Sequence, residues 1–397
     1  MTFIAKYLSD KLSSKANLVE EWLQSKLNKA HKLVYSSVDI RNSGYKLVPV
    51  DANLFPAGFN NLSESAKIYA AGILKEYFDK FQKIPTEIII IAESHTRNSF
   101  YISNLLALYE ILIQAGTQVI FATLDEEEIE ATSNEGKKII FKPLAKISLE
   151  GKLVILNNDL TNGPNEILKS SSSLILPPYQ LGWYQRKKSK FFEIYEQVTS
   201  EFAKEFGLDS FYFNSMVLNC QDVNFKTSSG VECIALKIEK TIHLLKEKYR
   251  EYNIKQEPYV IVKSNSGTYG MSVMAAHSGD DIIQMNKKKR NKMNSGKGGI
   301  ATDNVIIQEG IETIEHLGEN VAESMIYSVA AKPVSLIYRM HGEKGSKSNL
   351  NSVGMSFKEM DSGCRDHQFY YHYLVVKLTN IALINEINYY EGLNKND

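Results

Sequence analysis

The stretch YVIVKSNSGTYGMSVM, residues 259–274, decides how the second half of the chain is interpreted. Its first four residues are aromatic and β-branched, which predicts a buried strand. Lys263 follows with a charge, and a loop that contains Gly267 and Gly270 comes directly after it. A lysine and exposed backbone N–H groups can together hold a phosphate. The alternative is a plain hairpin whose lysine extends along apolar surface toward water.

The composition excludes several classes of protein. The 397 residues are enough for about two or three domains, and 46 Lys+Arg balance 46 Asp+Glu, so no overall field attracts nucleic acid or an anionic membrane. Three scattered cysteines give neither a disulfide framework nor a CxxC metal site. No signal peptide or spanning apolar stretch is recognised. We expect a cytoplasmic protein without nucleic-acid or membrane partners, and the sequence leaves homo-oligomer formation open.

Strand-like and helix-like segments alternate in the first 180 residues or so. The sequence predicts a strand in 86–98, a helix in 100–116, and further strands in 117–125 and 151–163. This rhythm favours a parallel sheet covered by helices, whose ligands gather beyond the carboxyl ends of the strands. The polar clusters at 93–98 and 157–159 would lie at those ends.

The pattern changes in the second half of the chain. Helices are predicted in 193–208, 235–252 and 279–293, and strands in 259–263, 303–311 and twice within 322–341. The segment SGKGG (295–299) is interpreted as a short flexible connection. The basic run Lys287–Arg290 lacks interleaved aromatic residues, so a solvated helix face is favoured over a nucleic-acid patch.

Polar groups accompany the later strands. The strand VIIQEGI ends in Gln308, Glu309 and a glycine, and Arg339 lies on a later strand. Asn349 and Asn351 are two residues apart, so both would face one side of an extended segment. Oxygen ligands of this kind suit Mg²⁺, which takes its remaining ligands from water and phosphate.

This ordered series resembles the ATP-grasp superfamily, in which two α+β lobes clamp ATP and activate a carboxylate as an acyl phosphate. The motifs point more narrowly to one group within it, the proteobacterial, ATP-grasp-like type of glutamate–cysteine ligase. The resemblance covers about residues 36–355 and is carried by SVDIRNSGYKLVPVDANLFPAGFNNL (37–62), ESHTRNSFY, PPYQLGWYQRKKSKFF, VKSNSGTYGMSVM, NKKKRNKM and VIIQEGI.

The resemblance implies an α/β protein with an ATP-grasp fold and an N-terminal parallel-sheet domain. We expect a substrate-binding domain at 1–182, a first ATP-grasp lobe with a helical linker at 183–258, and a C-terminal lobe at 259–397. The implied reaction joins the side-chain carboxylate of glutamate to cysteine, with ATP and Mg²⁺, as the first step of glutathione biosynthesis. A ligase with another amine acceptor and a non-catalytic binding homologue are the alternatives.

The resemblance also implies roles for individual residues. Lys263 and Arg339 would neutralise the transferring phosphoryl group. The expected nucleotide-binding residues are Lys188, Lys263, Ser266, Gly267, Tyr269, Gly270, Gln308 and Glu309. A second lysine near the phosphates is usual in the superfamily, and Lys187, Lys190 and Lys226 are alternatives to Lys188.

Glutamate would be held by the segment 37–62 and by the end of the strand at 86–98. The expected residues are Asp39, Arg41, Lys46, Asp51, Asn53, Arg97 and Asn98. Arginine can fork onto an α-carboxylate. The segment 37–62 has little predicted helix or strand, and an ordered loop whose polar side chains cap nearby turns is the alternative.

The predicted metal site departs from the family pattern. Asn349 stands where a carboxylate would be expected two residues before Asn351, and Ser348 precedes it. A neighbouring acid would have to supply the missing charge, and the nearby acids are Glu309, Glu323 and Glu343, of which Glu309 closes the strand VIIQE beside Gly310. We therefore predict Glu309, Asn349 and Asn351 as the Mg²⁺ ligands.

Overall fold

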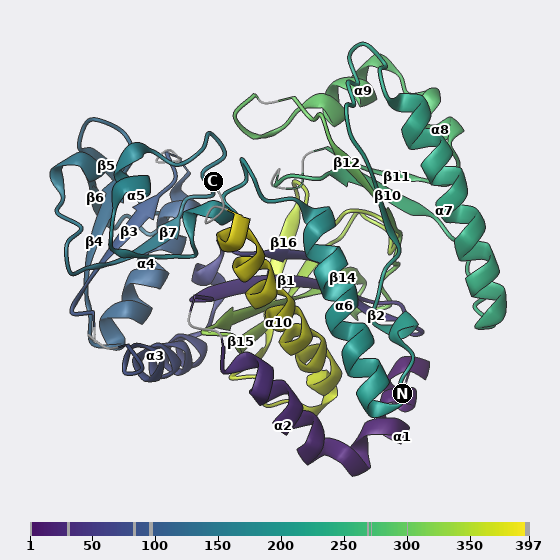
Figure 1. The fold of residues 1–397 in the computed structure, drawn as a ribbon, viewed down its shortest axis with the longest axis horizontal. Coiled ribbons are helices and arrows are strands. Elements are labelled where there is room, and N and C mark those ends of the chain that lie inside the picture. Colours follow the sequence, from purple (N-terminus) through teal and green to yellow (C-terminus); the bar gives the residue numbers. More distant parts are fainter. Residues whose placement is uncertain are drawn as a thin grey trace.

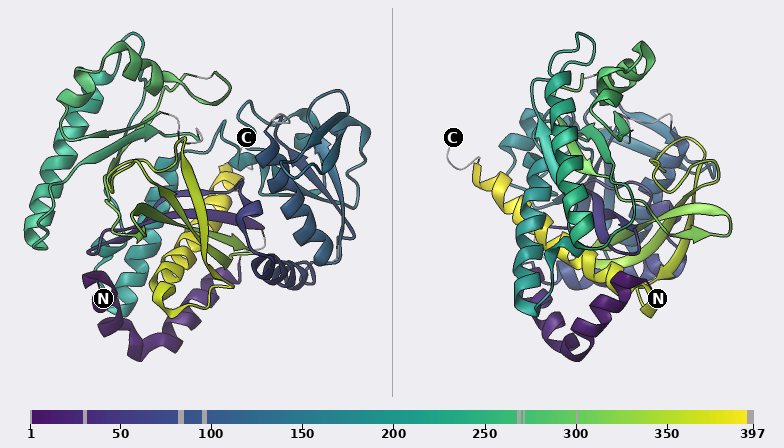
Figure 2. Two further views of the ribbon diagram at one scale, coloured as in Figure 1. Left: turned by 180° about the vertical axis from the view of Figure 1, so that it is seen from behind. Right: turned by 90° about the vertical axis from the view of Figure 1, so that its right-hand side faces the viewer.

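Three sheets lie side by side in the computed structural model, which describes residues 2–29, 32–81, 85–94, 98–267, 270, 272–299 and 301–393 (Figure 1). A parallel block occupies one end, an antiparallel sheet lies in the middle, and a smaller antiparallel sheet with its own helices lies at the other end. The view from behind shows the same three-part arrangement (Figure 2). The chain is therefore of the mixed α/β class, as the sequence predicts.

The parallel block confirms the strands and helices expected in the first half of the chain. Its sheet runs β5-β6-β4-β3-β7-β8, and only β5 is antiparallel to its neighbour. The strands are β3 (Glu87–Ala92), β4 (Gln118–Thr123), β5 (Ile129–Thr132), β6 (Lys138–Pro143), β7 (Leu153–Asn157) and β8 (Leu174–Leu176). The helices are α3 (Glu64–Phe78), α4 (Ser99–Gln114) and α5 (Glu166–Ser170). β3 and β7 are neighbours, so their carboxyl ends meet at one edge.

The central sheet contains the first two strands of the chain. Its order is β16-β15-β14-β1-β2, with β13 paired to β14, and every pairing is antiparallel. The strands are β1 (Tyr35–Asn42), β2 (Leu47–Asn53), β13 (His316–Leu317), β14 (Asn320–Val329), β15 (Lys332–His341) and β16 (Met355–Ser362). The prediction that 37–62 is poor in regular structure is wrong for residues 37–53, because they pair with each other and with β14.

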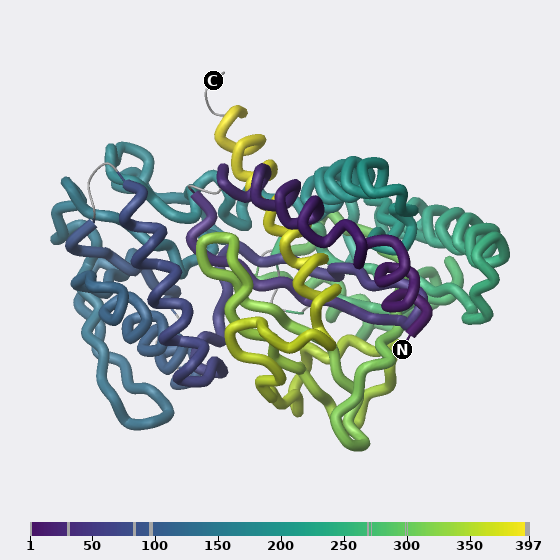
Figure 3. Tube along the Cα trace, turned by 90° about the horizontal axis from the view of Figure 1, so that it is seen from below, coloured from purple at the N-terminus to yellow at the C-terminus, as the bar shows by residue number. Residues whose placement is uncertain are grey.

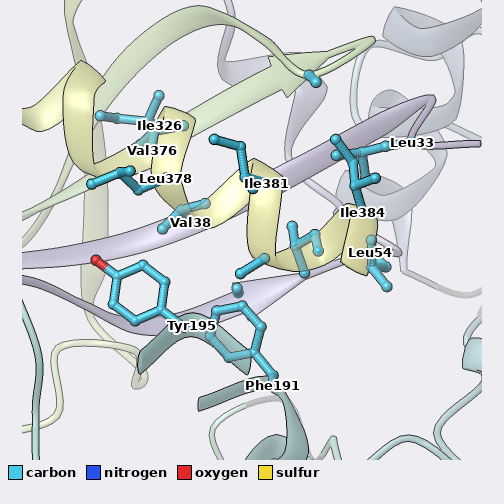
Figure 4. Packing of buried hydrophobic residues seen from close by; sticks show 14 of the residues in the cluster. Leu33, Val38, Leu54, Phe191, Tyr195, Ile326, Val376, Leu378, Ile381 and Ile384 are labelled. Carbon is cyan, nitrogen blue, oxygen red and sulfur yellow. The ribbon is translucent and has the colours of Figure 1, made fainter. Parts of the chain in front are cut away.

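Helices cover one face of the central sheet. These are α1 (Phe3–Leu12), α2 (Ala16–Leu27), α6 (Lys188–Phe206) and α10 (Tyr370–Leu393). Ile381 and Ile384 of α10 pack near Val38 of β1, with Phe191 and Tyr195 of α6 on the other side (Figure 4). Seen from below, α2 runs beside α10 (Figure 3). The face that carries Val38 is therefore sealed by helices.

The third sheet runs β11-β10-β12-β9 and is entirely antiparallel. Its strands are β9 (Val217–Cys220), β10 (Val260–Ser264), β11 (Val273–Ala276) and β12 (Val305–Glu309). The helices are α7 (Val231–Glu251), α8 (Asp280–Ile283) and α9 (Lys287–Asn294), so the helix expected at 279–293 is divided into two. Ile234, Ile238 and Ile242 recur every fourth residue of α7 and pack against the strands.

Short 3₁₀ helices connect these elements, at Ser13–Lys15, Phe59–Asn61, Leu144–Lys146, Tyr179–Leu181, Ser210–Tyr212, Lys297–Gly299 and His367–Phe369. The expected domain limits at 182 and 258 fall just before α6 and β10, and the domain assignment stays a prediction. Within the described ranges, no helix is both long and apolar enough to cross a membrane.

Candidate active site

A cleft of about 1280 Å³ is lined by residues of the central sheet, of the third sheet and of α4 in the parallel block. It brings together fourteen of the residues expected in the site: Asp39, Arg41, Asp51, Asn53, Asn98, Lys188, Lys263, Gly267, Gly270, Gln308, Glu309, Arg339, Asn349 and Asn351. Lys46 and Ser266 are not among the lining residues. Arg97 and Tyr269 lie outside the described residues. Residues that are remote in the sequence therefore converge on one cavity.

The alternation of β1 explains why its charged residues face the cleft. Val38 and Ile40 belong to the apolar core beneath the helices, and Asp39 and Arg41 line the cleft on the opposite face. Successive side chains of a strand point to opposite faces of a sheet. The sequence already alternates apolar and charged residues along β1. This alternation is difficult to recognise as a strand, because the charged residues face a buried polar cavity and not solvent.

Four charged residues of the central sheet form what we call the arginine cluster: Asp39, Arg41, Glu323 and Arg339. Glu323 and Arg339 are directly paired positions of β14 and β15. Arg339 Nη1 lies 2.7 Å from Glu323 Oε1 and 3.0 Å from Asp39 Oδ2. Arg41 Nε donates to Glu323 Oε2 at 2.9 Å. The two arginines therefore hold Glu323 between them.

Burial and ion pairing have different net effects on the two carboxyl groups of the arginine cluster. Burial opposes ionisation of Glu323, but Arg41 and Arg339 hold the pKa of this carboxyl below its usual range. For Asp39, burial dominates over the attraction of Arg339 and raises the pKa. Arg339 Nε is buried and has no hydrogen-bond partner within the described part of the chain. One donor of this cluster is thus without a protein partner among the described residues.

Arg41 has little capacity left for a substrate. Besides Glu323, its guanidinium donates to the carbonyl oxygens of Ile311 at 3.0 Å and Ser348 at 2.6 Å, and reaches that of Ser346 at 3.3 Å. These contacts fix the segment that leads to Asn349. The side chain therefore holds the wall of the cleft in place.

Three residues at another part of the cleft form what we call the lysine cluster: Asp51, Lys188 and Lys263. Lys188 Nζ makes an ion pair with Asp51, and Lys263 Nζ donates to the carbonyl oxygen of Val50 at 2.7 Å. Burial would raise the pKa of Asp51, but the two lysines hold it well below its usual range. Burial lowers the pKa of Lys263 to about 8, although Asp51 opposes this shift.

The alternatives to Lys188 are placed elsewhere. Lys187 Nζ donates to Ser266 Oγ at 3.1 Å, so it contacts the glycine loop without joining the lysine cluster. Lys190 pairs with the exposed Glu193. Lys226 is exposed on the turn before α7. Lys188 is the one of these four lysines that lines the cleft.

The hairpin in the segment 259–274 is present, and phosphate binding by its loop stays a prediction. β10 and β11 do form an antiparallel hairpin, yet Lys263, Gly267 and Gly270 line the cleft. A Cβ on Gly267 would lie 2.0 Å from ring carbons of Trp183, so no side chain fits there. Gly270 has φ +77°, which favours glycine. Both of these glycines are therefore packed closely against their surroundings.

Glu309 does not fit the predicted role of metal ligand. Its carboxylate is 1% exposed and accepts from Lys46 Nζ at 2.8 and 3.0 Å, from Tyr249 Oη at 3.0 Å and from the Met216 N–H at 3.1 Å. Both oxygens are therefore already engaged. Lys46 also lies 3.8 Å from the centre of the Phe211 ring, and burial lowers its pKa against the effect of Glu309. Lys46 is thus a buried partner of Glu309.

The remaining predicted residues are placed with fewer contacts. Gln308 Nε2 donates to Ser215 Oγ at 2.9 Å. Asn98 caps α4, since its side chain accepts from the N–H groups of Phe100 and Tyr101. Asn349 Oδ1 accepts from the Asn351 N–H at 3.0 Å. In the described part of the chain, no three His, Cys, Asp or Glu side chains form a metal-binding group.

A charged contact that the sequence did not reveal joins the third sheet to the parallel block. Lys297 Nζ lies 2.8 Å from Glu93 Oε2 and 2.6 Å from Asp159 Oδ2, at the carboxyl ends of β3 and β7. Burial and Asp159 raise the pKa of Glu93 against the effect of Lys297. The SGKGG segment was predicted to be a flexible connection, but Lys297 anchors it to the parallel block. The feature of the sequence that could have indicated this contact is a single lysine among glycines.

Comparisons with known proteins assign the chain to a family. The sequence matches the family model of glutamate-cysteine ligase over residues 9–385. No curated protein sequence matches it. Among solved structures, a candidate gamma-glutamylcysteine synthetase from Methylobacillus flagellatus KT is 32% identical, with a TM-score of 0.87 over 100% of this chain and 97% of that chain.

A glutathione synthetase-like effector from Globodera pallida is a distant match. It is 11% identical, with a TM-score of 0.35 over 90% of this chain and 80% of that chain, a likeness too low to carry an inference. The family model, in contrast, spans nearly the whole sequence. The chain therefore belongs to the glutamate-cysteine ligase family and is an ATP-dependent ligase.

Proposed function

We propose that this protein is a glutamate–cysteine ligase of the ATP-grasp-like type, with the two ATP-grasp lobes enclosing the cleft. It would join the side-chain carboxylate of glutamate to the amine of cysteine and release ADP and phosphate. The observation that carries this proposal is the presence of the lysine cluster and the arginine cluster in one cleft. One cluster suits phosphates, and the other suits an amino acid.

The lysine cluster would bind the phosphates of ATP. It contains two ammonium groups and one carboxylate, so it carries a positive surplus that an anion can neutralise. ATP would supply the phosphoryl group that converts the glutamate side chain into an acyl phosphate. Lys263 would neutralise charge on the transferring phosphoryl group, and its contact with the Val50 carbonyl holds the ammonium in position. Lys188 would exchange part of its contact with Asp51 for a phosphate oxygen.

The arginine cluster would hold the amino acid. Arg339 offers a buried donor, Nε, that lacks a protein partner among the described residues, and Asp39 offers a carboxylate to an ammonium group. Arg41 is then a positioning residue, because its guanidinium is occupied by Glu323 and backbone carbonyls. The expectation that Arg41 itself forks onto the substrate is therefore replaced by a role for Arg339.

Magnesium is implied by the family, but the predicted ligand set fits only in part. Asn349 and Asn351 line the cleft and carry amide oxygens of a suitable kind. Glu309 is engaged by three donors and does not complete the set. We therefore derive no step through the metal, and its ligands stay a prediction.

The test measures ADP release by the purified protein with Mg-ATP, in the presence and absence of each amino acid. We expect release to require glutamate, to increase with cysteine, and to accompany a product with the mass of γ-glutamylcysteine. Parallel reactions with 2-aminobutyrate and glycine in place of cysteine compare amine acceptors. Faster turnover with another amine would assign the chain to a related ligase. ADP release that is indifferent to glutamate would overturn the proposal.

A further inference from the structure

Two of the three cysteines lie against each other at the outer edge of the third sheet. Cys220 is the last residue of β9 and is 1% exposed, and Cys233 lies half-buried in the first turn of α7. Their Sγ atoms are 2.8 Å apart. The third cysteine, Cys364, lies at the end of β16 in the central sheet and is not in contact with this pair.

The chain between the two cysteines is packed so that it holds this distance. Val223 and Phe225 are buried in the core of the third sheet, and residues 224 and 229 form an isolated β-bridge. Gly230 has φ +74° and approaches the carbonyl oxygen of Asp222, which sets where α7 begins. A disulfide requires two side chains that already face each other across a short distance. This turn supplies such an arrangement with both backbones in place.

We propose that Cys220 and Cys233 form a reversible intramolecular disulfide. The bond would join β9 to α7 and enclose the turn between them. Formation would need only a movement of the two side chains, since the sulfur atoms are already in contact. This site is separate from the proposed ligase chemistry, and the inference does not depend on it.

The oxidant would be a small-molecule disulfide, RSSR, and the exchange would proceed in two steps. Cys233 is the more accessible sulfur, so its thiolate would attack RSSR, form a mixed disulfide and release one RSH after protonation. Cys220 would then lose its proton, attack Cys233 Sγ and release the second RSH. The protein loses two electrons and two protons, and RSSR gains both as two molecules of RSH.

The second step is hindered by the burial of Cys220, and one neighbouring cation partly offsets this effect. Lys237 lies one turn after Cys233 on α7, and its ammonium donates to the carbonyl of Asn219, next to Cys220. Burial raises the pKa of the Cys220 thiol to about 12, and Lys237 acts against that shift. The second step should therefore be the slower one, and it should accelerate at higher pH.

The disulfide would tie together two elements that support the cleft. β9 pairs with β12 through Val217 and Gln308, and α7 carries Tyr249, which donates to Glu309. Closing the turn also restricts the unfolded chain. The oxidised protein should therefore melt at a higher temperature than the reduced protein.

The test incubates the native full-length protein with glutathione disulfide and follows free thiols and intact mass. We expect the number of free thiols to fall from three to one and the mass to fall by about 2 Da, the two protons lost in forming one disulfide, and dithiothreitol should reverse both changes. Proteolytic mapping should link the peptides that contain Cys220 and Cys233. Cys364→Ser is the matched control and should retain the link.

Two results would overturn the inference. The first is three free thiols in folded protein after prolonged exposure to excess glutathione disulfide. The second is a mapped link that includes Cys364. Cys233→Ser should leave Cys220 without a partner and give no intramolecular link. If this variant did not fold, the peptide map of the unmodified sequence would still decide.

Discussion

The arginine cluster and the lysine cluster share one cleft but differ in charge balance. The arginine cluster has two guanidinium groups and two carboxylates, joined by direct ion pairs between 2.7 and 3.0 Å. The lysine cluster has two ammonium groups and one carboxylate, and Lys263 makes its shortest contact with a carbonyl oxygen. A balanced buried network holds the cleft wall rigid, whereas an unbalanced one attracts an anion. We therefore propose that the first region mainly holds the cleft wall while Arg339 and Asp39 contact the amino acid, and that the second region binds the phosphates of ATP.

The largest effect should come from breaking the balanced network. Arg339→Met would leave Glu323 and Asp39 buried near each other without this cation. Removing one partner of a buried ion pair typically costs about 3–5 kcal/mol, so the free energy of unfolding should fall by about that amount. Chemical denaturation monitored by circular dichroism measures the change. Arg365→Met, at an exposed position, is the matched control and should leave stability nearly unchanged. A nearly unchanged stability for Arg339→Met would show that the network does not hold the wall.

The lysine cluster should respond in activity instead of stability. Lys263→Met removes an ammonium that would stabilise the transferring phosphoryl group, while it also removes a buried charge from the folded protein. We expect kcat/KM for ATP to fall by an amount equivalent to about 2–4 kcal/mol, with an unfolding free energy close to that of the unmodified protein. Lys190→Met, on α6 outside the cleft lining, removes a lysine that pairs with Glu193 and lies over the Tyr389 ring, and it serves as the control. Unaltered kinetics in Lys263→Met would remove the phosphate site from the lysine cluster.

The pH dependence of ATP binding provides a finer test of the same difference. Burial lowers the pKa of Lys263 to about 8, so this ammonium loses its proton in the free enzyme as the pH rises through that value. Bound phosphates favour the protonated form of Lys263, so they raise the pKa of this lysine in the complex. The dissociation constant of ATP should therefore increase above pH 8, by up to about tenfold per pH unit.

Competition binding between about pH 7 and about pH 9.5 measures this effect. Lys263→Arg keeps its charge throughout that range and should show a flatter profile. If the dissociation constant of ATP did not increase in the unmodified protein, Lys263 would not control ATP binding in this range. If it increased equally in Lys263→Arg, another group would be responsible.

Most of the fold could be predicted from local sequence patterns. Periodicity and turn residues correctly placed the helices α4, α6 and α7 and the strands β3, β4, β7, β10, β12, β14 and β15. They did not indicate β5, β6 or β8 of the parallel sheet. Fourteen candidate residues also converge on one cleft, because the carboxyl ends of strands and the polar positions of strands were followed. The ATP-grasp assignment itself came from the family resemblance and not from these patterns.

What could not be predicted depends on contacts between distant segments. The strands β1 and β2 were missed because the partners of their charged residues come from distant segments. Asp39 and Arg41 pair with Arg339 and Glu323 of β15 and β14, and Asp51 pairs with Lys188 of α6. Glu309 seemed free in the sequence, yet its partners Lys46, Met216 and Tyr249 come from three remote elements. Partner choice among buried charges is a property of the assembled fold, and spacing in the sequence does not encode it.

The smallest effect should come from the amide pair that lines the same cleft, Asn349 and Asn351. Their turn is stabilised by the backbone N–H of Asn351, which donates to Asn349 Oδ1. Asn349→Asp retains this acceptor and Asn351→Ala retains this donor, so both variants should fold normally. The first adds a negative charge where the family places one, and the second removes a neutral oxygen ligand. We expect the Mg²⁺ concentration needed for half-maximal nucleotide binding to decrease in Asn349→Asp and to increase in Asn351→Ala. Each change should be less than about tenfold, since water and phosphate provide most of the ligands of this ion.

Titration calorimetry of ATP at several Mg²⁺ concentrations measures both changes without relying on turnover. An identical Mg²⁺ requirement in all three proteins would place the metal away from this pair.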